Sequence, residues 1–252
     1  MHHSEMERGQ MDMIELHHKE TALKAMSRDG VLVCHNMIDN KQIHNLKFEI
    51  NKINELVLSK IKSMDRPLKT YTDIAERELG RLDYRCGFTA EIFSIVSQPI
   101  IRLVNDLSPM INFKHYWGAI PSLGGSGPTN MHRDVYPITN NMKNEDLSSY
   151  DIGLPPYYFT ALIPLVEITK ESGPTQFIKC SHRKPVVDID DEETYSPLLK
   201  LGDLVIFDGR TLHKGSANLT KEVRFVAYIT FIADWYHDQT FTINDFLFPE
   251  LQ

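Results

Sequence analysis

The residues with the clearest chemical potential are two histidines and one aspartate in the second half of the chain. His132 and Asp134 are separated by a single residue, and His213 lies much farther along the sequence. Two imidazoles and one carboxylate form the ligand set that holds a non-haem Fe(II) and leaves coordination positions open for oxygen chemistry. The pattern therefore predicts an iron site that carries out an oxidation.

The spacing of the first two residues has a structural reason if they lie on a β-strand. Successive side chains of a strand point to opposite faces, so His132 and Asp134 would share a face while Arg133 turns away. The third ligand must then come from another strand. A closed or double-sheet β structure can bring His213 back to the same point, so we expect the site to lie between strands.

An arginine follows the last of these residues in the sequence at a spacing that could bring it to the metal site. Arg224 lies eleven positions after His213, near the start of segment 223–232, which is rich in β-branched and aromatic residues. This composition is typical of a strand. A planar guanidinium at the start of that strand would reach toward the metal and bind a carboxylate through two parallel hydrogen bonds. Arg224 is therefore a candidate anchor for a dicarboxylate co-substrate.

Taken together, these residues resemble the phytanoyl-CoA dioxygenase family of Fe(II)- and 2-oxoglutarate-dependent oxygenases. The resemblance extends over residues 28–236, and its motifs fall in the second half of that range. One further motif supports it: the family usually carries an Asn-Gly pair followed by Pro-Gly-Ser-His. This chain keeps Gly173, Ser181 and His182, but has Ser172, Lys179 and Cys180 in place of the asparagine, proline and glycine. The departures fall outside the ligand set and concern a local turn.

The resemblance implies both the cofactors and the reaction. His132, Asp134 and His213 would hold Fe(II), while 2-oxoglutarate binds the iron through its keto acid end and meets Arg224 with its far carboxylate. With O2, the co-substrate gives succinate and CO2, and an unactivated C–H bond of a small organic substrate is oxidised. Hydroxylation is the expected outcome, but desaturation, cyclisation or epoxidation stay open, as does the identity of the substrate.

Two polar residues near the ligands are candidates for binding the co-substrate. Asn130 lies two positions before His132 and should share its face, where its carboxamide could bond a carboxylate of 2-oxoglutarate. Thr160 could do the same from a facing strand. For each residue, a hydrogen-bonded polar group in the core is an equally good interpretation.

The metal pattern alone is also compatible with a different class of function. The chain could be a non-oxygenase β-sandwich metal-binding protein, meaning a structural or binding module or a metal-dependent isomerase or hydrolase. Arg224 discriminates between the two classes, because a structural metal site has no need of an anchor for a dicarboxylate.

Composition sets the broad class of the protein. The chain has 252 residues, of which 42% are hydrophobic, so it is long enough to bury a large core. The 27 basic and 34 acidic residues give a formal charge of −7, and no basic stretch predicts nucleic-acid binding. Cys34, Cys86 and Cys180 are odd in number and far apart, which favours free thiols in a reducing compartment and a cytoplasmic location.

The sequence also predicts the state of the N-terminal segment, the number of domains and the kind of partner. Residues 1–19 are polar and lack an apolar run, which predicts a disordered N-terminus without a signal peptide or membrane span. Residues 20–252 are expected to form a single Fe(II)/2-oxoglutarate dioxygenase domain. Its partner would be a small-molecule substrate, with neither nucleic acid nor membrane, and it would be a monomer or a weak homo-oligomer.

The order of the predicted elements points to one fold class. Apolar residues from Ile43 to Ile61 recur at steps of three and four, which predicts an amphipathic helix over residues 40–63. Residues 66–86 are polar and predict a loop, and from residue 112 onward strand-like segments alternate with turns. We therefore expect a mainly β fold, a double-stranded β-helix (jelly-roll, cupin-like) with N-terminal and flanking α-helices packed on one sheet.

Two polar stretches are expected to shape the substrate side of the site. Residues 136–156 follow the metal pair directly and lack periodicity, which favours a lid over the iron. The earlier stretch carries Arg81, Asp83 and Arg85 in alternation. That pattern suits either substrate binding or a solvated strand edge, and the sequence leaves the choice open.

Overall fold

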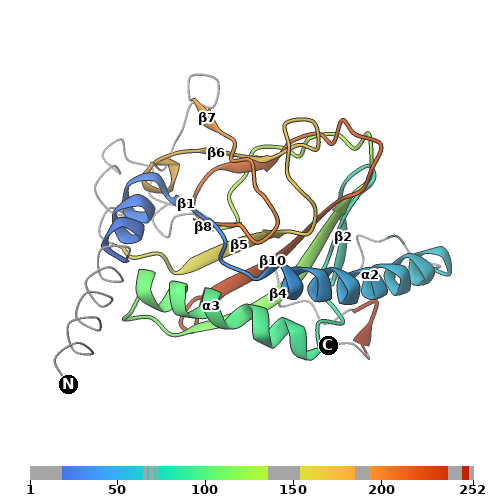
Figure 1. The fold of residues 1–252 in the computed structure, drawn as a ribbon, viewed down its shortest axis with the longest axis horizontal. Coiled ribbons are helices and arrows are strands. Elements are labelled where there is room, and N and C mark those ends of the chain that lie inside the picture. Colours follow the sequence, from blue (N-terminus) through green and yellow to red (C-terminus); the bar gives the residue numbers. More distant parts are fainter. Residues whose placement is uncertain are drawn as a thin grey trace.

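The protein is built of three layers, two facing β-sheets and a layer of helices on the outer side of the larger sheet (Figure 1). The layer of helices consists mainly of α2 (Asn40–Lys62) and α3 (Glu91–Leu107). A mainly β jelly-roll with helices packed on one sheet was predicted, and it is confirmed. The computed structural model describes residues 19–64, 67, 71, 73–135, 154–184, 193–237 and 246–249.

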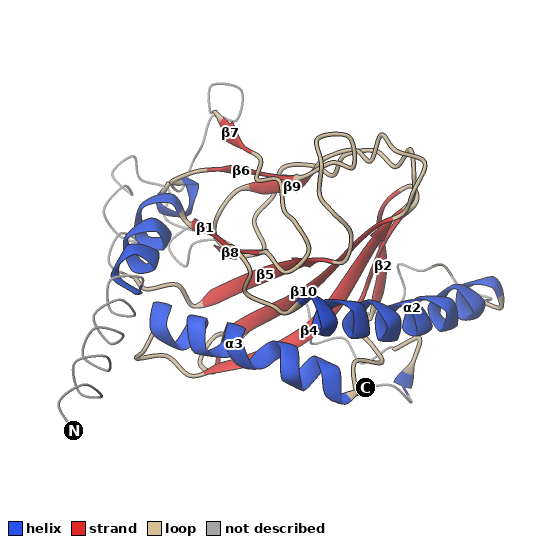
Figure 2. Ribbon diagram, viewed as in Figure 1, coloured by secondary structure: helices blue, strands red, loops and turns tan. Residues whose placement is uncertain are grey.

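The larger sheet contains seven antiparallel strands in the order β1-β8-β5-β10-β4-β3-β2, and the smaller sheet has the order β7-β6-β9. Strands far apart in the sequence are thus neighbours, as Figure 2 shows for β5, β10 and β4. The larger sheet comprises β1 (Val31–Cys34), β2 (Ile74–Glu78), β3 (Arg81–Tyr84), β4 (Phe113–Ser122), β5 (Tyr158–Pro164), β8 (Leu204–Asp208) and β10 (Arg224–Ala233). The smaller comprises β6 (Thr175–Ile178), β7 (Thr194–Tyr195) and β9 (His213–Gly215).

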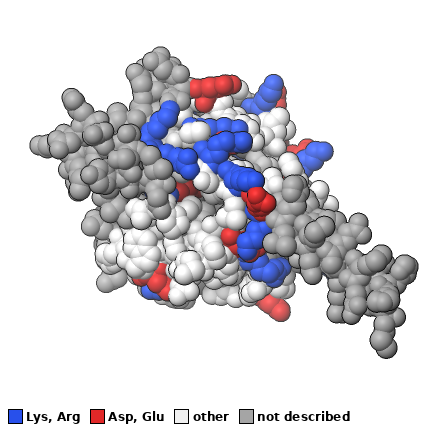
Figure 3. Space-filling view, turned by 90° about the vertical axis from the view of Figure 1, so that its left-hand side faces the viewer, with Lys and Arg blue, Asp and Glu red and all other residues white. Residues whose placement is uncertain are grey.

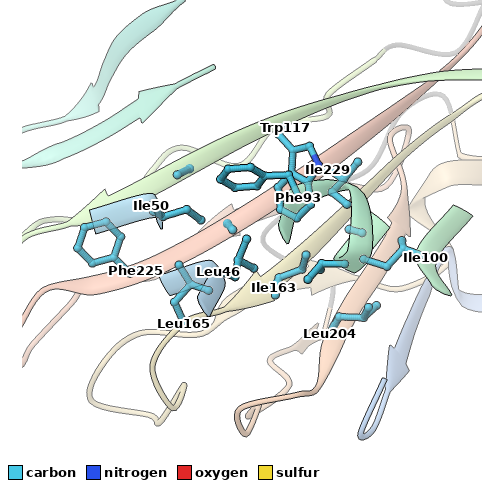
Figure 4. Close-up of a cluster of buried hydrophobic side chains, with 14 of the residues drawn as sticks. Leu46, Ile50, Phe93, Ile100, Trp117, Ile163, Leu165, Leu204, Phe225 and Ile229 are labelled. Carbon is cyan, nitrogen blue, oxygen red and sulfur yellow. The ribbon is translucent and has the colours of Figure 1, made fainter. Parts of the chain in front are cut away.

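The side chains of the larger sheet alternate between two faces, and the face toward the helices is apolar. Trp117, Ile163 and Ile229, from three neighbouring strands, point toward the helices and pack in the main hydrophobic core (Figure 4). Their sequence neighbours point the other way, toward the smaller sheet. The face turned away from the helices therefore has to supply the floor of any site between the two sheets.

Helix α2 forms where the apolar spacing predicted it. Its residues at steps of three and four are all buried, from Ile43 to Val57. The helix begins after Asp39, whose carboxylate accepts the backbone N–H of Lys41 at 2.8 Å. The Gln42 side chain accepts the N–H of Asp39 at 3.3 Å in return, which completes a capping box.

The prediction of a loop over residues 66–86 was wrong for residues 74–84. The segment contains β2 and β3, which form an antiparallel hairpin at the edge of the larger sheet. A solvated strand edge was one of the two interpretations left open for Arg81 and Asp83, but Arg81 is 2% exposed and Asp83 is 6% exposed. Both lie on the inner face of β3, while Tyr84 packs into the core on the other face.

Two further expectations concern segments that lie mostly outside the described residues. They are the disordered N-terminus over residues 1–19 and the lid over residues 136–156. Within the described part of the chain, a helix covers residues 19–29, and it is followed by β1. None of the described helices combines the length and the apolar character needed to cross a membrane.

One surface collects positive side chains. Figure 3 faces the side of the molecule that carries helix 19–29 and shows Lys and Arg gathered in a band with acidic side chains at its edges. Ion pairs offset part of this charge, because Lys24 pairs with Glu20 and Asp29 lies beside both Arg28 and Lys179. The pair of Lys24 and Glu20 is exposed on both sides, and such pairs contribute little to stability.

A buried hydrogen bond between α3 and β4 gives a test of this core. The Trp117 indole N–H donates to the Ser97 hydroxyl at 3.0 Å. We expect Ser97→Ala to lower the free energy of unfolding by about 1–3 kcal/mol, since it leaves a buried donor without a partner. Urea denaturation measures the change. Ser94→Ala, on the exposed side of the same helix, should have almost no effect, and equal effects of the two variants would contradict the assignment.

Candidate active site

Two backbone segments that run side by side bring the candidate ligands together. The amide of His132 donates to the carbonyl of His213 at 2.9 Å, and the reverse bond has the same length. Farther along, the amide of Asp134 donates to the carbonyl of Gly209 at 2.9 Å. His132 and Asp134 were predicted to share a strand, but the structure has only an isolated bridge at His132. The expected proximity therefore comes from the pairing of an irregular segment at residues 132–135 with residues 209–213, the last of which begins β9.

The three side chains converge on one point. One possible ligand atom from each of His132, Asp134 and His213 lies within 4.8 Å of the other two. The Nε2 atom of His213 is 3.6 Å from the Oδ1 atom of Asp134. Two imidazole nitrogens and a carboxylate oxygen at these separations can hold one metal ion of the kind that accepts mixed nitrogen and oxygen ligands.

Backbone carbonyls determine which imidazole nitrogen is available to a metal. The Nδ1 atom of His132 is 2.8 Å from the Asn130 carbonyl, and that of His213 is 3.0 Å from the Thr211 carbonyl. Because a carbonyl only accepts, Nδ1 must carry the proton, and the lone pair of Nε2 is left for a metal. Burial also lowers the pKa of His213, which favours the neutral form that metal binding requires.

Thr160 positions the carboxylate of the site. Its hydroxyl, 6% exposed on β5, donates to the Oδ2 atom of Asp134 at 2.6 Å. A hydroxyl has only one proton to donate, and in this structure Thr160 donates it to Asp134; a bond from Thr160 to the co-substrate stays a prediction. Asn130 also borders the site, where its carbonyl orients His132 and its side chain is exposed.

A pair of buried arginines lies in the same cavity. Arg224, at the start of β10, is 6% exposed, and Arg81, at the start of β3, is 2% exposed. Both residues are paired with Ser122 of β4 in the sheet register, so they lie in one row. Arg224 donates to the carbonyls of Ser172, Gly173 and Ser216 and to the Ser122 hydroxyl, and Arg81 donates to the carbonyls of Gly215 and Ser216.

All these acceptors are neutral, so the hydrogen bonds themselves do not offset the positive charge of the pair. In the part of the chain that the structure describes, neither Arg81 nor Arg224 forms an ion pair, and the Nε atom of each is buried without a hydrogen-bond partner. Burial lowers the pKa of Arg81; burial together with the charge of Arg81 lowers the pKa of Arg224 to about 9. Two adjacent buried cations of this kind favour the binding of an anion.

The motif around Gly173 holds Arg224 in place. Gly173 has a φ of +86°, and a Cβ atom there would lie 2.2 Å from the Ala217 carbonyl oxygen and 2.9 Å from the guanidinium of Arg224. Only glycine fits this position without displacing the arginine. The carbonyl of Ser172, which stands where the family usually has asparagine, accepts from Arg224 at 3.2 Å.

The second half of that motif supports His213. The Ser181 hydroxyl accepts the backbone N–H of Leu212, the residue before His213, at 2.8 Å. Cys180, in place of the family's glycine, adopts a φ of +63°, a left-handed conformation that is uncommon for residues other than glycine. The departures noted in the sequence thus leave this turn in the shape that a glycine would favour.

A cavity of about 480 Å³ unites the metal site and the arginine pair. Its floor is the inner face of the larger sheet, because Thr160, Leu162, Val226 and Tyr228 all line it. A volume in this range is typical of sites for small molecules. Arg81 was not predicted to form a pair with Arg224. The alternation of charged residues from Arg81 to Arg85 was the available signal, since it places one face of a strand in the site.

The chain matches a family model over most of its length. The family is described as Phytanoyl-CoA dioxygenase (PhyH), and the match covers residues 26–226.

Curated relatives are fungal dioxygenases. The iron/alpha-ketoglutarate-dependent dioxygenase penM of Penicillium thymicola is 30% identical over 113 residues, which are 42% of this chain and 34% of that protein. The Fe(II)/2-oxoglutarate-dependent dioxygenase nvfF of Aspergillus novofumigatus is 25% identical over 218 residues, 79% of this chain and 66% of that protein. The chain thus spans about a third of the length of the first relative and just under two thirds of the length of the second.

Solved structures share the fold. The alpha-ketoglutarate-dependent epimerase SnoN from nogalamycin biosynthesis gives a TM-score of 0.62 at 16% identity and covers 85% of this chain and 82% of its own. The carbocyclase SnoK from the same biosynthesis gives a TM-score of 0.62 at 16% identity, over 84% of this chain and 83% of its own. At this identity, the likeness concerns the fold alone.

The hydrogen bond from Thr160 to Asp134 can be tested by metal titration. Thr160→Val keeps the shape of the side chain but removes the donor that orients the carboxylate. We expect Fe(II) to bind roughly ten- to a hundred-fold more weakly, the usual effect of losing a residue that orients a metal ligand. Thr230→Val is a matched control, because Thr230 lines the cavity beside Thr160 on β10. Equal Fe(II) affinities in wild type and Thr160→Val would refute this role.

Proposed function

The chain belongs to the phytanoyl-CoA dioxygenase family, and from that premise we propose that it is an Fe(II)- and 2-oxoglutarate-dependent oxygenase. Its reaction would oxidise, and most simply hydroxylate, an unactivated C–H bond of a small organic substrate, with release of succinate and CO2. The observation that carries this proposal is the presence, in one cavity, of a His-Asp-His cluster and a buried arginine pair that has no carboxylate partner among the described residues.

His132, Asp134 and His213 would hold the iron. The proposal is supported by the chemistry of the donors, because two neutral imidazoles and one carboxylate suit Fe(II) and occupy only part of its coordination sphere. When bound together with 2-oxoglutarate and O2, the iron supplies the oxidising power for attack on a C–H bond. The carbonyls of Asn130 and Thr211 keep the imidazoles in the tautomer that binds metal.

Arg224 and Arg81 would bind the far carboxylate of 2-oxoglutarate. A dianion offsets the charge of the two guanidinium groups, and the unpartnered Nε atoms provide donors that it can use. Both side chains are held rigidly by backbone carbonyls of the 172–173 and 215–216 segments, so little conformational freedom is lost on binding. Asn130 remains a candidate for a further bond to the co-substrate from the edge of the cavity.

The alternative of a structural or binding metal site has less support. A metal site that serves only stability gains nothing from two buried arginines in the same cavity, and their burial costs free energy. Family membership also favours the oxygenase.

The substrate class, the cellular compartment and the oligomeric state are part of the same proposal. The family and the cavity size favour a small-molecule substrate, with neither nucleic acid nor membrane involved. Cys34, Cys86 and Cys180 are free thiols, which supports a reducing compartment such as the cytoplasm. We propose a monomer or a weak homo-oligomer of one dioxygenase domain.

Loss of any one ligand tests the metal assignment. His132→Ala, Asp134→Ala and His213→Ala should each abolish succinate formation from 2-oxoglutarate, because each removes one of few protein bonds to the iron. The variants should remain folded, since the main core lies on the other face of the sheet. Succinate assays with circular dichroism as the folding control measure both, and turnover like wild type in any variant would contradict the assignment.

Arg224 allows a graded test of co-substrate binding. Hydrogen bonds to a charged partner contribute about 1.5–3 kcal/mol, so Arg224→Ala should weaken 2-oxoglutarate binding by roughly ten- to a hundred-fold. Arg224→Lys should recover only part of this affinity, because it keeps the charge but loses the planar fork. Arg81→Gln should also weaken binding.

The measurement is an anaerobic titration of the Fe(II) protein with 2-oxoglutarate, followed by its visible charge-transfer band. Fe(II) affinity serves as the control and should be unchanged in the arginine variants. Equal dissociation constants in wild type, Arg224→Ala and Arg81→Gln would remove the proposed anchor.

A further inference from the structure

A second group of charged residues lines the cavity beyond the arginine pair. It consists of Arg77 on β2 and of Asp83 on β3 with Arg85 just after it, and we call it the β-hairpin charge group. Asp83 lies two residues after Arg81, so it shares the inner face of the strand. None of these residues has a part in the metal site or in the binding of 2-oxoglutarate proposed above.

Tyr228 of β10 ties this group together. Arg77 donates from Nε and Nη2 to the Oδ2 atom of Asp83 at 2.9 and 2.7 Å. The Tyr228 hydroxyl donates to the Oδ1 atom of Asp83 at 2.7 Å, and it accepts from the Nε atom of Arg85 at 2.8 Å. Both oxygens of the single carboxylate are therefore engaged, one by Arg77 and one by Tyr228.

The glycine of β4 beneath Tyr228 makes this arrangement possible. A Cβ atom on Gly118 would lie 2.1 Å from the Cζ atom of Tyr228. The ring therefore lies across β4, and its hydroxyl reaches the residues of β3. A larger residue at 118 would have to displace the ring and break both hydrogen bonds of its hydroxyl.

The group carries an excess of positive charge. It contains two guanidinium groups and one carboxylate. Although burial opposes its ionisation, Arg85 and Arg77 keep the pKa of Asp83 below the ordinary value, so the net charge is +1 at neutral pH. The group is also accessible at one end, because the Arg77 side chain is 47% exposed while that of Asp83 is 7% exposed.

The proposed function uses both ends of 2-oxoglutarate, one at the metal and one at the arginine pair, so neither end is left for this group. Arg224 and Tyr228 are four residues apart on β10, which corresponds to roughly 13 Å along a strand. The apolar side chains of Ile120, Leu162 and Val226 line the same cavity. A ligand that used the second group would therefore have an anionic end and an apolar body.

We propose that the β-hairpin charge group binds an oxyanion carried by the substrate, so that the enzyme acts on an organic acid or a phosphate ester with an apolar body. This inference rests on the proposed function, because it assumes that 2-oxoglutarate occupies the arginine pair. A guanidinium group binds a carboxylate or a phosphate through the same pair of parallel hydrogen bonds. Binding of the anionic end at Arg77 and Arg85 would leave the apolar body to extend along the sheet toward the metal site.

The test uses matched anionic and neutral probes. The protein is loaded with Mn(II) in place of iron and saturated with 2-oxoglutarate, which keeps the probes away from Arg224. Calorimetric titrations then compare phenylacetate and decanoate with their primary amides, and phenyl phosphate with phenylacetate. We expect at least one anion to bind roughly ten-fold or more tightly than its neutral counterpart, and the comparison with phenyl phosphate distinguishes a carboxylate from a phosphate.

Variants assign the preference to the group. Arg77→Gln and Arg85→Gln should each reduce the preference for the anion by roughly ten-fold and leave the affinity for the amide unchanged. Arg77→Lys should retain part of it. Arg28→Gln is a matched control, because Arg28 also pairs with an aspartate, Asp29, at 2.7 and 2.8 Å, but does not line this cavity. Unchanged 2-oxoglutarate affinity verifies that each variant is folded.

The outcomes separate this inference from the proposed function. Failure of the Mn(II) protein to bind 2-oxoglutarate would contradict the proposed function. If 2-oxoglutarate binds but no anion is preferred over its neutral counterpart, whether both bind or neither does, only the inference is overturned. A preference that survives in Arg77→Gln and in Arg85→Gln also overturns it, since the anion would then bind elsewhere.

Discussion

The pleat of the seven-stranded sheet is the constraint on which the rest of this structure depends. Its outer face must bury apolar side chains against α2 and α3, and Trp117 and Ile229 do so. Because side chains alternate, the residues between them are committed to the inner face. That face carries Thr160, Tyr228 and Arg224, so the same strands that build the core also build the floor of the cavity.

The metal cluster lies above this floor and is held by backbone hydrogen bonds outside the larger sheet. Residues 129–135 are not a regular strand, yet backbone hydrogen bonds to residues 209–215 hold them in register. The imidazoles receive their orientation from carbonyls of their own segments, and the carboxylate receives its orientation from Thr160 of the sheet. The rigid sheet and the irregular segments therefore each contribute part of the geometry that a metal would need.

The sequence predicts the residues that carry chemistry better than it predicts how they are supported. Ligand types, their order and Arg224 could be inferred because each chemical role restricts the residue type. The hairpin of β2 and β3 could not, since charged residues that face a polar cavity have the composition of a solvated loop. The role of Thr160 was also hidden, because only the folded chain shows that Asp134 accepts its hydroxyl.

The charges of the cavity explain why this fold tolerates so many buried arginines. Arg81 and Arg224 are held by neutral carbonyls, which orient them but do not offset their charge. Burying such groups destabilises the free protein, and the low pKa of Arg224, about 9, reflects that cost. An anionic ligand recovers this free energy on binding, because it restores the counter-charge that the core withholds. The arginine pair thus converts a deficit of folding stability into affinity for anions.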